Sequence, residues 1–241
     1  MNTPPGPGPN PGTVDLDDAR RALRRGSAVV LPNPTPLTHV VAAPDPQAVN
    51  TAKGRPADQA VALWTHDPAT FAATAEALDL TESLAAVARR LLTEEHVTLL
   101  VPLRSGANHP DWLAPASRDG WTMLFGARWT PILPVLADHP ILYVSSANRT
   151  GHPSAATTAD ATSMFPPTVP VLTLPSPTGT DPDPAQPPRA ATTTLRLHPD
   201  GRIDLHRHGA QDRPHANSAR YLEHLRATYR APGPGGGRSA P

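Results

Sequence analysis

Short apolar segments of strand length alternate with amphipathic segments of helical length through the middle of this chain, and this alternation limits its possible folds more than any other feature. The predicted strands cover residues 28–31, 61–64, 97–103, 122–127 and 141–144, and a later pair at 192–197 and 202–206 forms a hairpin around a Pro-Asp-Gly turn. The predicted helices cover residues 16–25, 67–78, 82–92, 131–137 and 217–230. We therefore expect a mixed α/β domain.

Proline and glycine mark the limits of this domain. Residues 1–12 and 231–241 are rich in both, cannot supply a packed core, and are predicted to be disordered tails. Residues 166–188 are also rich in proline and are interpreted as a long loop inside a domain of residues 13–210, which a helical segment at 211–230 follows. We expect no second domain after this helix, and we expect the proline-rich loop to act as a lid.

The charge balance, the lack of cysteine and the lack of long apolar runs exclude several functions. With 21 basic and 21 acidic residues the formal net charge is zero, so any anion site has to be local. Without cysteine the chain has no disulfides, thiolate metal ligands or cysteine nucleophiles. No run approaches the roughly 18 apolar residues of a membrane span, and no export signal is visible, so we expect a cytoplasmic protein without a membrane partner. Nothing indicates the oligomeric state.

Lysine occurs once in this sequence, at position 53, whereas the other 20 basic residues are arginine. A lysine ammonium is a compact point charge and an arginine guanidinium is a planar fork, so the lone lysine is a reasonable place to look for chemistry. The segment Lys53-Gly54-Arg55-Pro56 places the two kinds of cation around a glycine, which suits a phosphate or a carboxylate. A solvated surface turn explains the same residues about equally well.

A second polar segment, Ser145-Ser146-Ala147-Asn148, directly follows the predicted strand at 141–144. Ligands gather at the carboxyl ends of strands in open α/β sheets, so these hydroxyl and amide groups are candidates for binding phosphate or ribose. The alternative is a polar loop that caps a helix at residues 157–163.

The late hairpin carries a row of threonines at 192–194 and ends near Arg207. Such a hydroxyl row is common in cross-strand pairing and means little by itself. His206 and His208 have no acidic partner nearby in sequence, so we expect no metal site.

In their order along the chain, these segments resemble the YrdC-like family of threonylcarbamoyl-AMP synthases. The resemblance covers roughly residues 14–210 and rests on Lys53-Gly54-Arg55-Pro56, on Ser146-Ala147-Asn148-Arg149-Thr150-Gly151, on Thr192-Thr193 and on Arg207-His208-Gly209. It implies a twisted mixed sheet with helices on both faces and an open concave cleft. It also implies the family reaction, in which L-threonine, bicarbonate and ATP, accompanied by Mg²⁺, give threonylcarbamoyl-AMP and pyrophosphate for threonylcarbamoyladenosine in tRNA.

The resemblance also implies roles by position. Lys53 and Arg55 are the implied catalytic residues, in contact with the triphosphate and the substrate carboxylate. The other implied residues are Ser146, Asn148, Thr192 and Arg207 for the nucleotide, and Pro32, Thr35, Thr98 and Arg128 for the second substrate. Positive groups at such positions neutralise charge on the α-phosphate and on the leaving pyrophosphate. No side-chain nucleophile is required because the carbamate itself attacks.

One departure from the family pattern concerns the turn that helps to shape the amino-acid pocket. The family turn reads P-T-D-T-x-Y-G, whereas residues 32–38 of this chain read Pro-Asn-Pro-Thr-Pro-Leu-Thr. Only Pro32 and Thr35 match. The sequence therefore predicts an altered choice of amino acid.

Two further departures lie on the central strands. The family segment P-G-P-x-T becomes residues 94–98, where Glu94 and Glu95 would repel an anionic substrate unless they are paired or turned away. Gly126 stands where the family has an arginine, and Arg128, two residues later, is the candidate to replace it.

Three functions stay open. The chain is a synthase of the family reaction, a diverged carbamoyl-adenylate enzyme that uses another amine, or a non-catalytic module that binds nucleotide or double-stranded RNA. The matching residues belong to the nucleotide side and the altered ones to the amino-acid side, which favours an ATP-dependent enzyme with altered substrate choice. The neutral net charge argues mildly against RNA.

Overall fold

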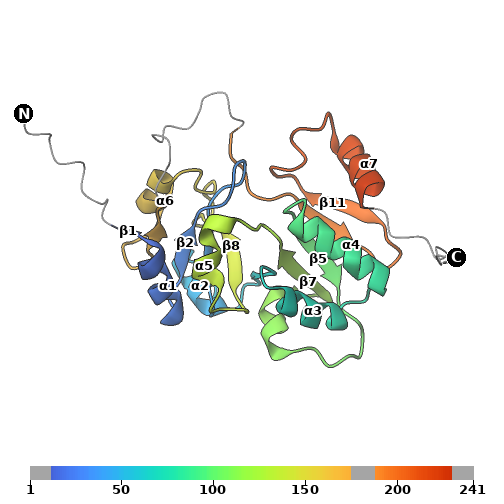
Figure 1. The fold of residues 1–241 in the computed structure, drawn as a ribbon, viewed down its shortest axis with the longest axis horizontal. Coiled ribbons are helices and arrows are strands. Elements are labelled where there is room, and N and C mark those ends of the chain that lie inside the picture. The colour runs from blue at the N-terminus through green and yellow to red at the C-terminus, as the bar shows by residue number, and fades with distance from the viewer. Residues whose placement is uncertain (1–11, 175–187, 230–241) are drawn as a thin grey trace, which may run out of the picture.

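The computed structural model describes residues 12–174 and 188–229, which form one large mixed sheet covered by helices (Figure 1). The strand order is β1-β9-β2-β3-β8-β4-β7-β5-β10-β11, and β6 pairs with β7 outside this path. Strands pair in both directions, since β4 runs parallel to β7 but antiparallel to β8. The predicted mixed α/β fold is confirmed.

The element bounds complete this description. The strands are β1 (Thr13–Val14), β2 (Val29–Leu31), β3 (Val40–Ala43), β4 (Ala62–Trp64), β5 (Thr98–Pro102), β6 (Ser117–Arg118), β7 (Trp121–Phe125), β8 (Tyr143–Ser146), β9 (Val171–Leu172), β10 (Thr194–Leu197) and β11 (Ile203–Arg207). The helices are α1 (Leu16–Arg24), α2 (Pro46–Ala52), α3 (Pro68–Ala77), α4 (Glu82–Thr93), α5 (Leu133–Leu136), α6 (Thr158–Met164) and α7 (Ser218–Thr228), with 3₁₀ turns η1 (Asp111–Ala116) and η2 (Thr130–Ile132).

Helices cover the two faces of the sheet unequally. One face carries α2, α3, α4, α6 and α7, and Leu91 and Tyr221 are fully buried in the core that these helices share with the sheet. The other face carries α1 and α5, whose apolar side chains pack in a second core around Trp64 and Phe125. Because only these two of the described helices pack on the second face, part of the sheet there is left for a pocket.

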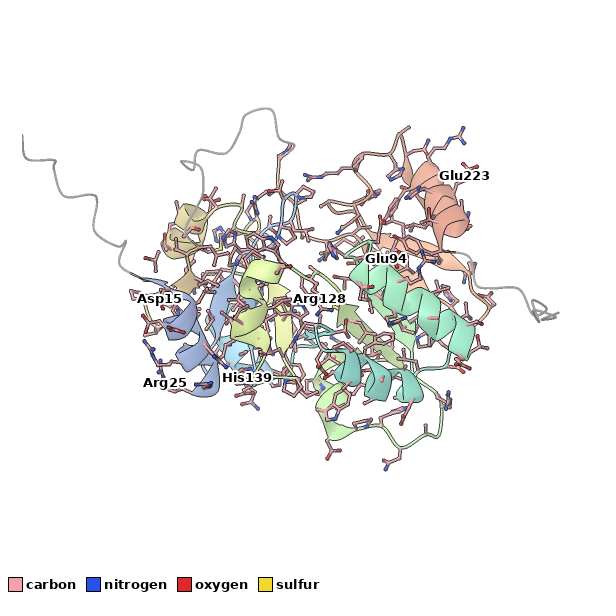
Figure 2. All side chains as sticks on the ribbon, viewed as in Figure 1. Asp15, Arg25, Glu94, Arg128, His139 and Glu223 are labelled. Atoms are coloured by element: carbon pink, nitrogen blue, oxygen red, sulfur yellow. The ribbon has the colours of Figure 1, made fainter. Side chains whose placement is uncertain are left out.

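Most of the predicted elements form, and side-chain caps hold the first turns of α1 and α7. Asp15 and Arg25 mark the two ends of α1 (Figure 2). Asp15 caps the helix by accepting a hydrogen bond from the Asp18 amide at 2.8 Å, and Gly26, which has a φ of 79°, follows its end. Asn217 caps α7 in the same way through the Arg220 amide at 3.0 Å. Local side-chain chemistry therefore fixes where these helices begin.

Several short elements were not predicted, and one boundary was misplaced. The strands β1, β3 and β6, the helix α2 and the 3₁₀ turn η1 have no predicted counterpart, and β9 lies inside the segment 166–188 that was interpreted as a loop. β9 is only two residues long, and its pairing with β1 and β2 is long-range, so no local pattern indicates it. The predicted strand at 192–197 begins only at Thr194, since Thr192 and Thr193 lie in the approach to it.

Several predictions concern residues outside the described ranges. The two predicted tails lie outside them except for Gly12, and so do residues 175–187 of the proline-rich loop. Within the described part, no helix is long and apolar enough to cross a membrane.

Candidate functional site

The main pocket lies on the less covered face of the sheet and has a volume of about 380 Å³. Ligand pockets commonly fall in the range of about 300–1,000 Å³. Its apolar floor comes from strand residues such as Val40, Ala62, Phe125 and Val144. Polar groups from the ends of several strands and from the segment after α2 surround this floor, and none of the described lining residues is a carboxylate.

Seven of the ten residues implied by the sequence line this pocket: Lys53, Arg55, Thr98, Ser146, Asn148, Thr192 and Arg207. They come from segments far apart in the chain, and the sheet order brings these segments together. Pro32, Thr35 and Arg128 do not line it.

The segment Lys53-Gly54-Arg55 forms the C-terminal cap of α2. Gly54 has a φ of 63°, in the left-handed region that favours glycine, and its amide donates to the Thr51 carbonyl at 3.0 Å. The Arg55 amide reaches back to the Asn50 carbonyl at 3.1 Å. These two bonds make a Schellman cap, in which glycine satisfies a backbone requirement. The cap directs both cationic side chains towards the pocket.

Lys53 is only 4% exposed, so the interpretation as a solvated surface turn is wrong for this side chain. Its ammonium donates to the Asn148 carbonyl at 2.7 Å, to Asn148 Oδ1 at 2.8 Å and to the Ser146 carbonyl. Burial and, to a smaller extent, the neighbouring Arg55 charge together lower the pKa of Lys53 to about 7. All three ammonium donors thus have acceptors in the turn after β8.

The polar side chains of this turn also satisfy one another. Ser146 donates its hydroxyl to Asn148 Oδ1 at 2.6 Å, and Asn148 Nδ2 donates to the carbonyls of Arg149 and His152 at 3.2 and 2.9 Å. The turn is therefore a rigid wall of the pocket. Ser145, by contrast, lines the pocket and makes no side-chain hydrogen bond within the described chain.

Arg55 and Arg207 are the lining cations with donors to spare. Arg55 Nε donates to Asn50 Oδ1 at 2.5 Å, but its Nη2 is buried and has no partner among the described residues. Arg207 makes one long bond, from Nη2 to the Thr192 carbonyl at 3.3 Å. A guanidinium stays protonated and offers a fork of donors that fits phosphate or carboxylate. These two side chains can therefore bind an anion.

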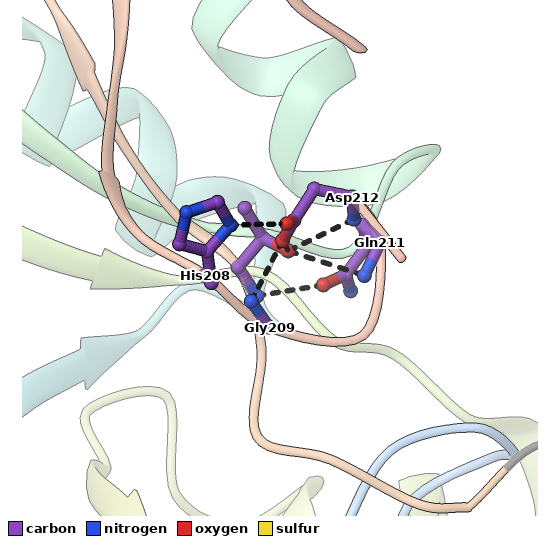
Figure 3. A network of polar contacts seen from close by, with 5 residues as sticks. His208, Gly209, Gln211 and Asp212 are labelled. Carbon is purple, nitrogen blue, oxygen red and sulfur yellow. Dashed lines mark hydrogen bonds and ion pairs between the residues drawn. The ribbon is translucent and has the colours of Figure 1, made fainter. Parts of the chain in front are cut away.

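A polar network holds the far side of the pocket (Figure 3). Asp212 is 8% exposed and accepts hydrogen bonds from the Gly209 amide at 2.7 Å, from Thr193 Oγ1 at 2.6 Å and from His208 Nδ1 at 2.6 Å. Next to it, Thr98 and Thr192 share a hydroxyl hydrogen bond of 2.6 Å at the pocket surface. The prediction that His208 lacks an acidic partner is wrong, because Asp212 lies four residues later.

The turn after β2 forms another wall, and Arg189 holds it. Arg189 Nη1 donates to the carbonyls of Asn33 and Leu37 at 3.1 and 2.8 Å, and its Nη2 donates to Thr35 Oγ1 at 2.9 Å. The Thr35 hydroxyl is therefore bonded to Arg189, and Thr35 does not line the pocket. The following residue, Ala190, pairs with Leu37 in an isolated bridge. The segment after the proline-rich loop thus shapes the pocket.

Sequence reasoning did not single out Asn33, which is 2% exposed and lines the pocket. Its Nδ2 donates to the Thr38 carbonyl at 2.9 Å, and its Oδ1 is buried without a partner in the part of the chain that is described. The only sequence signal is its place inside the altered turn, because the partner Arg189 lies 156 residues away.

The two glutamates before β5 are paired and do not line the pocket. Glu94, at the end of α4 (Figure 2), binds Arg90 at 3.0 Å. Glu95 accepts hydrogen bonds from the hydroxyls of Tyr221 and Tyr229, both at 3.1 Å. The sequence left two ways in which these glutamates would not repel an anionic substrate, by being paired or by being turned away. The structure shows that both are paired. An anionic ligand in the pocket therefore does not meet these carboxylates.

Gly126 and Arg128 follow β7, and neither lines the pocket. A Cβ on Gly126 would lie 2.3 Å from the Leu92 carbonyl oxygen, so the position has no room for an arginine. Met123 and Phe125 of β7 line the pocket, whereas Arg128 lies beyond the end of this strand and is exposed (Figure 2).

A metal site is not built into the described residues, which contain no group of three His, Asp or Glu side chains able to hold a metal ion. The pocket offers only hydroxyl, amide and carbonyl oxygens, whereas Mg²⁺ in proteins is usually held through carboxylates and substrate phosphates. The protein residues alone therefore do not fit Mg²⁺.

The fold and the pocket define an α/β protein with a pocket lined by cationic side chains on one face of a mixed sheet. A family model described as "Telomere recombination", that of Sua5, YciO and YrdC, matches residues 21–183. The chain belongs to this family. A search of curated protein sequences finds no match.

Solved structures agree on the fold at low sequence identity. E. coli YciO aligns with a TM-score of 0.57 and 13% identity over 80% of this chain and 88% of that chain. P. abyssi Sua5 complexed with L-threonine aligns with a TM-score of 0.53 and 17% identity over 76% of this chain and 52% of that chain. Full-length HypF in a phosphate- and nucleotide-bound form aligns with a TM-score of 0.57 and 15% identity over 84% of this chain and 30% of that chain. The chain thus spans about half the length of Sua5 and less than a third of HypF.

Proposed function

We propose that this protein is an ATP-dependent enzyme that forms a carbamoyl-adenylate, as a threonylcarbamoyl-AMP synthase does. The observation that carries the proposal is the pair of guanidinium groups, Arg55 and Arg207, that line a pocket without carboxylates and have free donors. Such a pocket suits a triphosphate. Support comes from the family membership and from the nucleotide named in the HypF structure.

The proposed reaction has two steps. An amine and bicarbonate first give a carbamate and water. A carbamate oxygen then attacks the α-phosphorus of ATP, and the bond to the β-phosphate oxygen breaks, so that pyrophosphate leaves. Negative charge grows on the α-phosphate and on the leaving group, and fixed positive groups stabilise that charge. Arg55 and Arg207 supply them in this proposal.

Lys53, Ser146 and Asn148 have a different role in this proposal. Their hydrogen-bonding groups are already used within the turn after β8, so they position the pocket wall. The hydroxyl of Ser145, which has no partner in the described chain, remains free for a phosphate or ribose oxygen, and the hydrogen-bonded hydroxyl pair of Thr98 and Thr192 keeps one further donor at the pocket lining. Mg²⁺ would arrive bound to the triphosphate, and none of the steps assigned to this chain depends on it.

The amine substrate is the second part of the proposal. Threonine is the first candidate because P. abyssi Sua5 is known complexed with L-threonine. The altered turn, clamped by Arg189, leaves room for a different amine. The product would enter threonylcarbamoyladenosine synthesis if the amine is threonine, and another carbamoyl-transfer pathway if it is not.

The test is pyrophosphate release with ATP, Mg²⁺, bicarbonate and each amino acid in turn, together with calorimetry of ATP binding. Release with threonine supports the family reaction, and release only with another amine supports a diverged enzyme. An absence of release with every amine, together with an absence of ATP binding, would refute the proposal.

Two variants and one matched control sharpen this test. Arg55→Met and Arg207→Met should each weaken ATP binding at least about ten-fold, because each removes a charged donor to phosphate. Arg226→Met changes an exposed arginine at the end of α7 and should leave ATP binding unchanged.

A further inference from the structure

Arg207 lines the pocket at the point where the regular pairing of β10 with β11 ends. The register between these strands shifts between Thr194 and Leu195, and Arg207 is the last residue of β11. Within the described chain its guanidinium makes one hydrogen bond, a long one of 3.3 Å from Nη2 to the Thr192 carbonyl. The position of this cation therefore depends on the segment that follows β11.

This segment folds back onto the residues that precede β10. The Ala210 amide donates to the Ala191 carbonyl at 2.9 Å. Gly209 packs so closely that a Cβ on it would lie 2.2 Å from the Thr193 nitrogen. Atoms that are not bonded do not approach one another to this distance, so only glycine fits. Two stretches of backbone thus lie directly against one another beside Arg207.

Asp212 joins these two stretches (Figure 3). Its Oδ1 accepts hydrogen bonds from the Gly209 amide at 2.7 Å and from Thr193 Oγ1 at 2.6 Å. The Thr193 hydroxyl oxygen accepts from the amides of Gln211 and Asp212 at 3.1 and 3.2 Å, so its proton points to the carboxylate. Thr193 is fully buried and Asp212 is 8% exposed, so water competes little for these bonds.

We propose that Asp212 is a positioning residue, which sets the place of Arg207 in the pocket and thereby the affinity for the triphosphate. Asp212 does not itself line the pocket. It binds Gly209, two residues after Arg207. It also binds Thr193, and the carbonyl of the preceding residue accepts the hydrogen bond from Arg207. The inference rests on the proposed ATP-dependent reaction, in which Arg207 contacts the phosphates.

The two carboxylate oxygens of Asp212 have separate partners. Oδ1 holds Gly209 and Thr193, whereas Oδ2 binds Nδ1 of His208, whose side chain is 73% exposed. An asparagine can keep the oxygen towards Gly209 and Thr193 and turn its Nδ2 towards His208, since a neutral imidazole accepts through Nδ1 in its other tautomer. A positioning role therefore predicts that Asp212→Asn is tolerated and that Asp212→Ala is not.

Calorimetry of ATP binding in the presence of Mg²⁺ tests this on the whole chain. Asp212→Ala should weaken ATP binding at least about ten-fold, whereas Asp212→Asn should stay within about three-fold of the wild type. Asp67→Ala is the matched control, because Asp67 also accepts from an amide and a hydroxyl, those of Thr70 at 2.7 and 3.1 Å, and does not line the pocket. It should lower the free energy of unfolding and leave ATP affinity unchanged.

A double-mutant cycle distinguishes positioning from a general loss of stability. If Asp212 acts through Arg207, the combination of Asp212→Ala with Arg207→Met should bind ATP about as weakly as Arg207→Met alone, and not about a hundred-fold more weakly than the wild type. Thermal unfolding checks that each variant is folded. Thr193→Val removes the same hydrogen bond while keeping the side-chain shape, and it replaces Asp212→Ala in the cycle if that variant does not fold.

The outcomes separate this inference from the function on which it rests. Additive losses in the cycle, or wild-type ATP affinity in a folded variant without the hydrogen bond, would overturn the role of Asp212 and leave the proposed reaction intact. Loss of affinity in Asp212→Asn as large as in Asp212→Ala would also overturn it, because the accepting oxygen is then present without effect. If the wild type does not bind ATP, the proposed function fails and the inference fails with it.

Discussion

Lys53 donates hydrogen bonds to the carbonyl and to the Oδ1 of Asn148, at 2.7 and 2.8 Å, although 95 residues separate the two in the sequence. The pair joins the end of α2 to the turn after β8, on one wall of the pocket. Its third bond goes to the Ser146 carbonyl. The only lysine of the chain therefore holds two elements together, and Arg55 and Arg207 carry the free donors.

The pKa of Lys53 is expected near 7, because burial lowers it from 10.5 and the Arg55 charge adds to the effect. An NMR titration of the single lysine side chain measures it without ambiguity. Between about pH 7 and 10.5 the unfolded chain binds more protons than the folded one, so stability should rise with pH relative to Lys53→Met. A measured pKa above 10 would contradict this account.

Lys53→Met should lower both stability and ATP affinity, whereas Arg55→Met should lower mainly ATP affinity. Lys53→Met removes three hydrogen bonds to Ser146 and Asn148 and is expected to lower the free energy of unfolding by roughly 3 kcal/mol. It should also lower ATP affinity, because the pocket wall formed by the turn after β8 is then held less firmly. Arg55→Met removes an unpaired donor, so ATP affinity should fall with a much smaller loss of stability. Urea unfolding and calorimetry distinguish the two, and an equal loss of stability would refute the distinction.

The sequence predicted the parts of the site that are short and local. The Lys53-Gly54-Arg55 segment is a helix cap within one turn of backbone, and the Ser146–Asn148 segment follows directly on an apolar strand. Patterns of this length determine local geometry. The resemblance then related them across the chain, and seven of the implied residues line one pocket.

The parts that were missed depend on contacts between distant segments. Arg189 reaches the Asn33 turn across 156 residues, and Glu95 meets Tyr221 across 126. A sequence pattern does not reveal which far segment supplies a partner. The burial of Lys53 was missed for the same reason, since its acceptors come from β8 and the turn after it.

Arg189→Ala should weaken the use of the amine substrate more than the binding of ATP. Three hydrogen bonds from this guanidinium hold the turn that carries Asn33, and their loss frees the turn. We expect KM for the amine to rise about ten-fold with a smaller change in the Kd for ATP. Arg213→Ala is the matched control, because Arg213 binds the neighbouring Pro188 carbonyl at 2.8 Å and does not contact the turn. Equal effects of the two variants would contradict the clamp.

His39→Leu should make the protein more resistant to acid. His39 is 4% exposed, and neither ring nitrogen has a hydrogen-bond partner within normal distance and angle among the described residues. Burial lowers its pKa to about 4, the Arg189 charge adds to the shift, and the Ala155 backbone and Asp160 oppose it. Between about pH 6.5 and 4 the unfolded chain binds an extra proton, so the wild type should lose stability on the order of 3 kcal/mol as the pH falls.

The variant lacks this titrating group, so its unfolding free energy should change less over the same interval. His152→Leu removes an exposed histidine and should leave the acid dependence of the wild type intact. Urea unfolding at pH 7 and pH 4.5 measures all three proteins. Parallel losses in the wild type and in His39→Leu would show that His39 is protonated in the folded protein, which its unpartnered nitrogens and its burial both oppose.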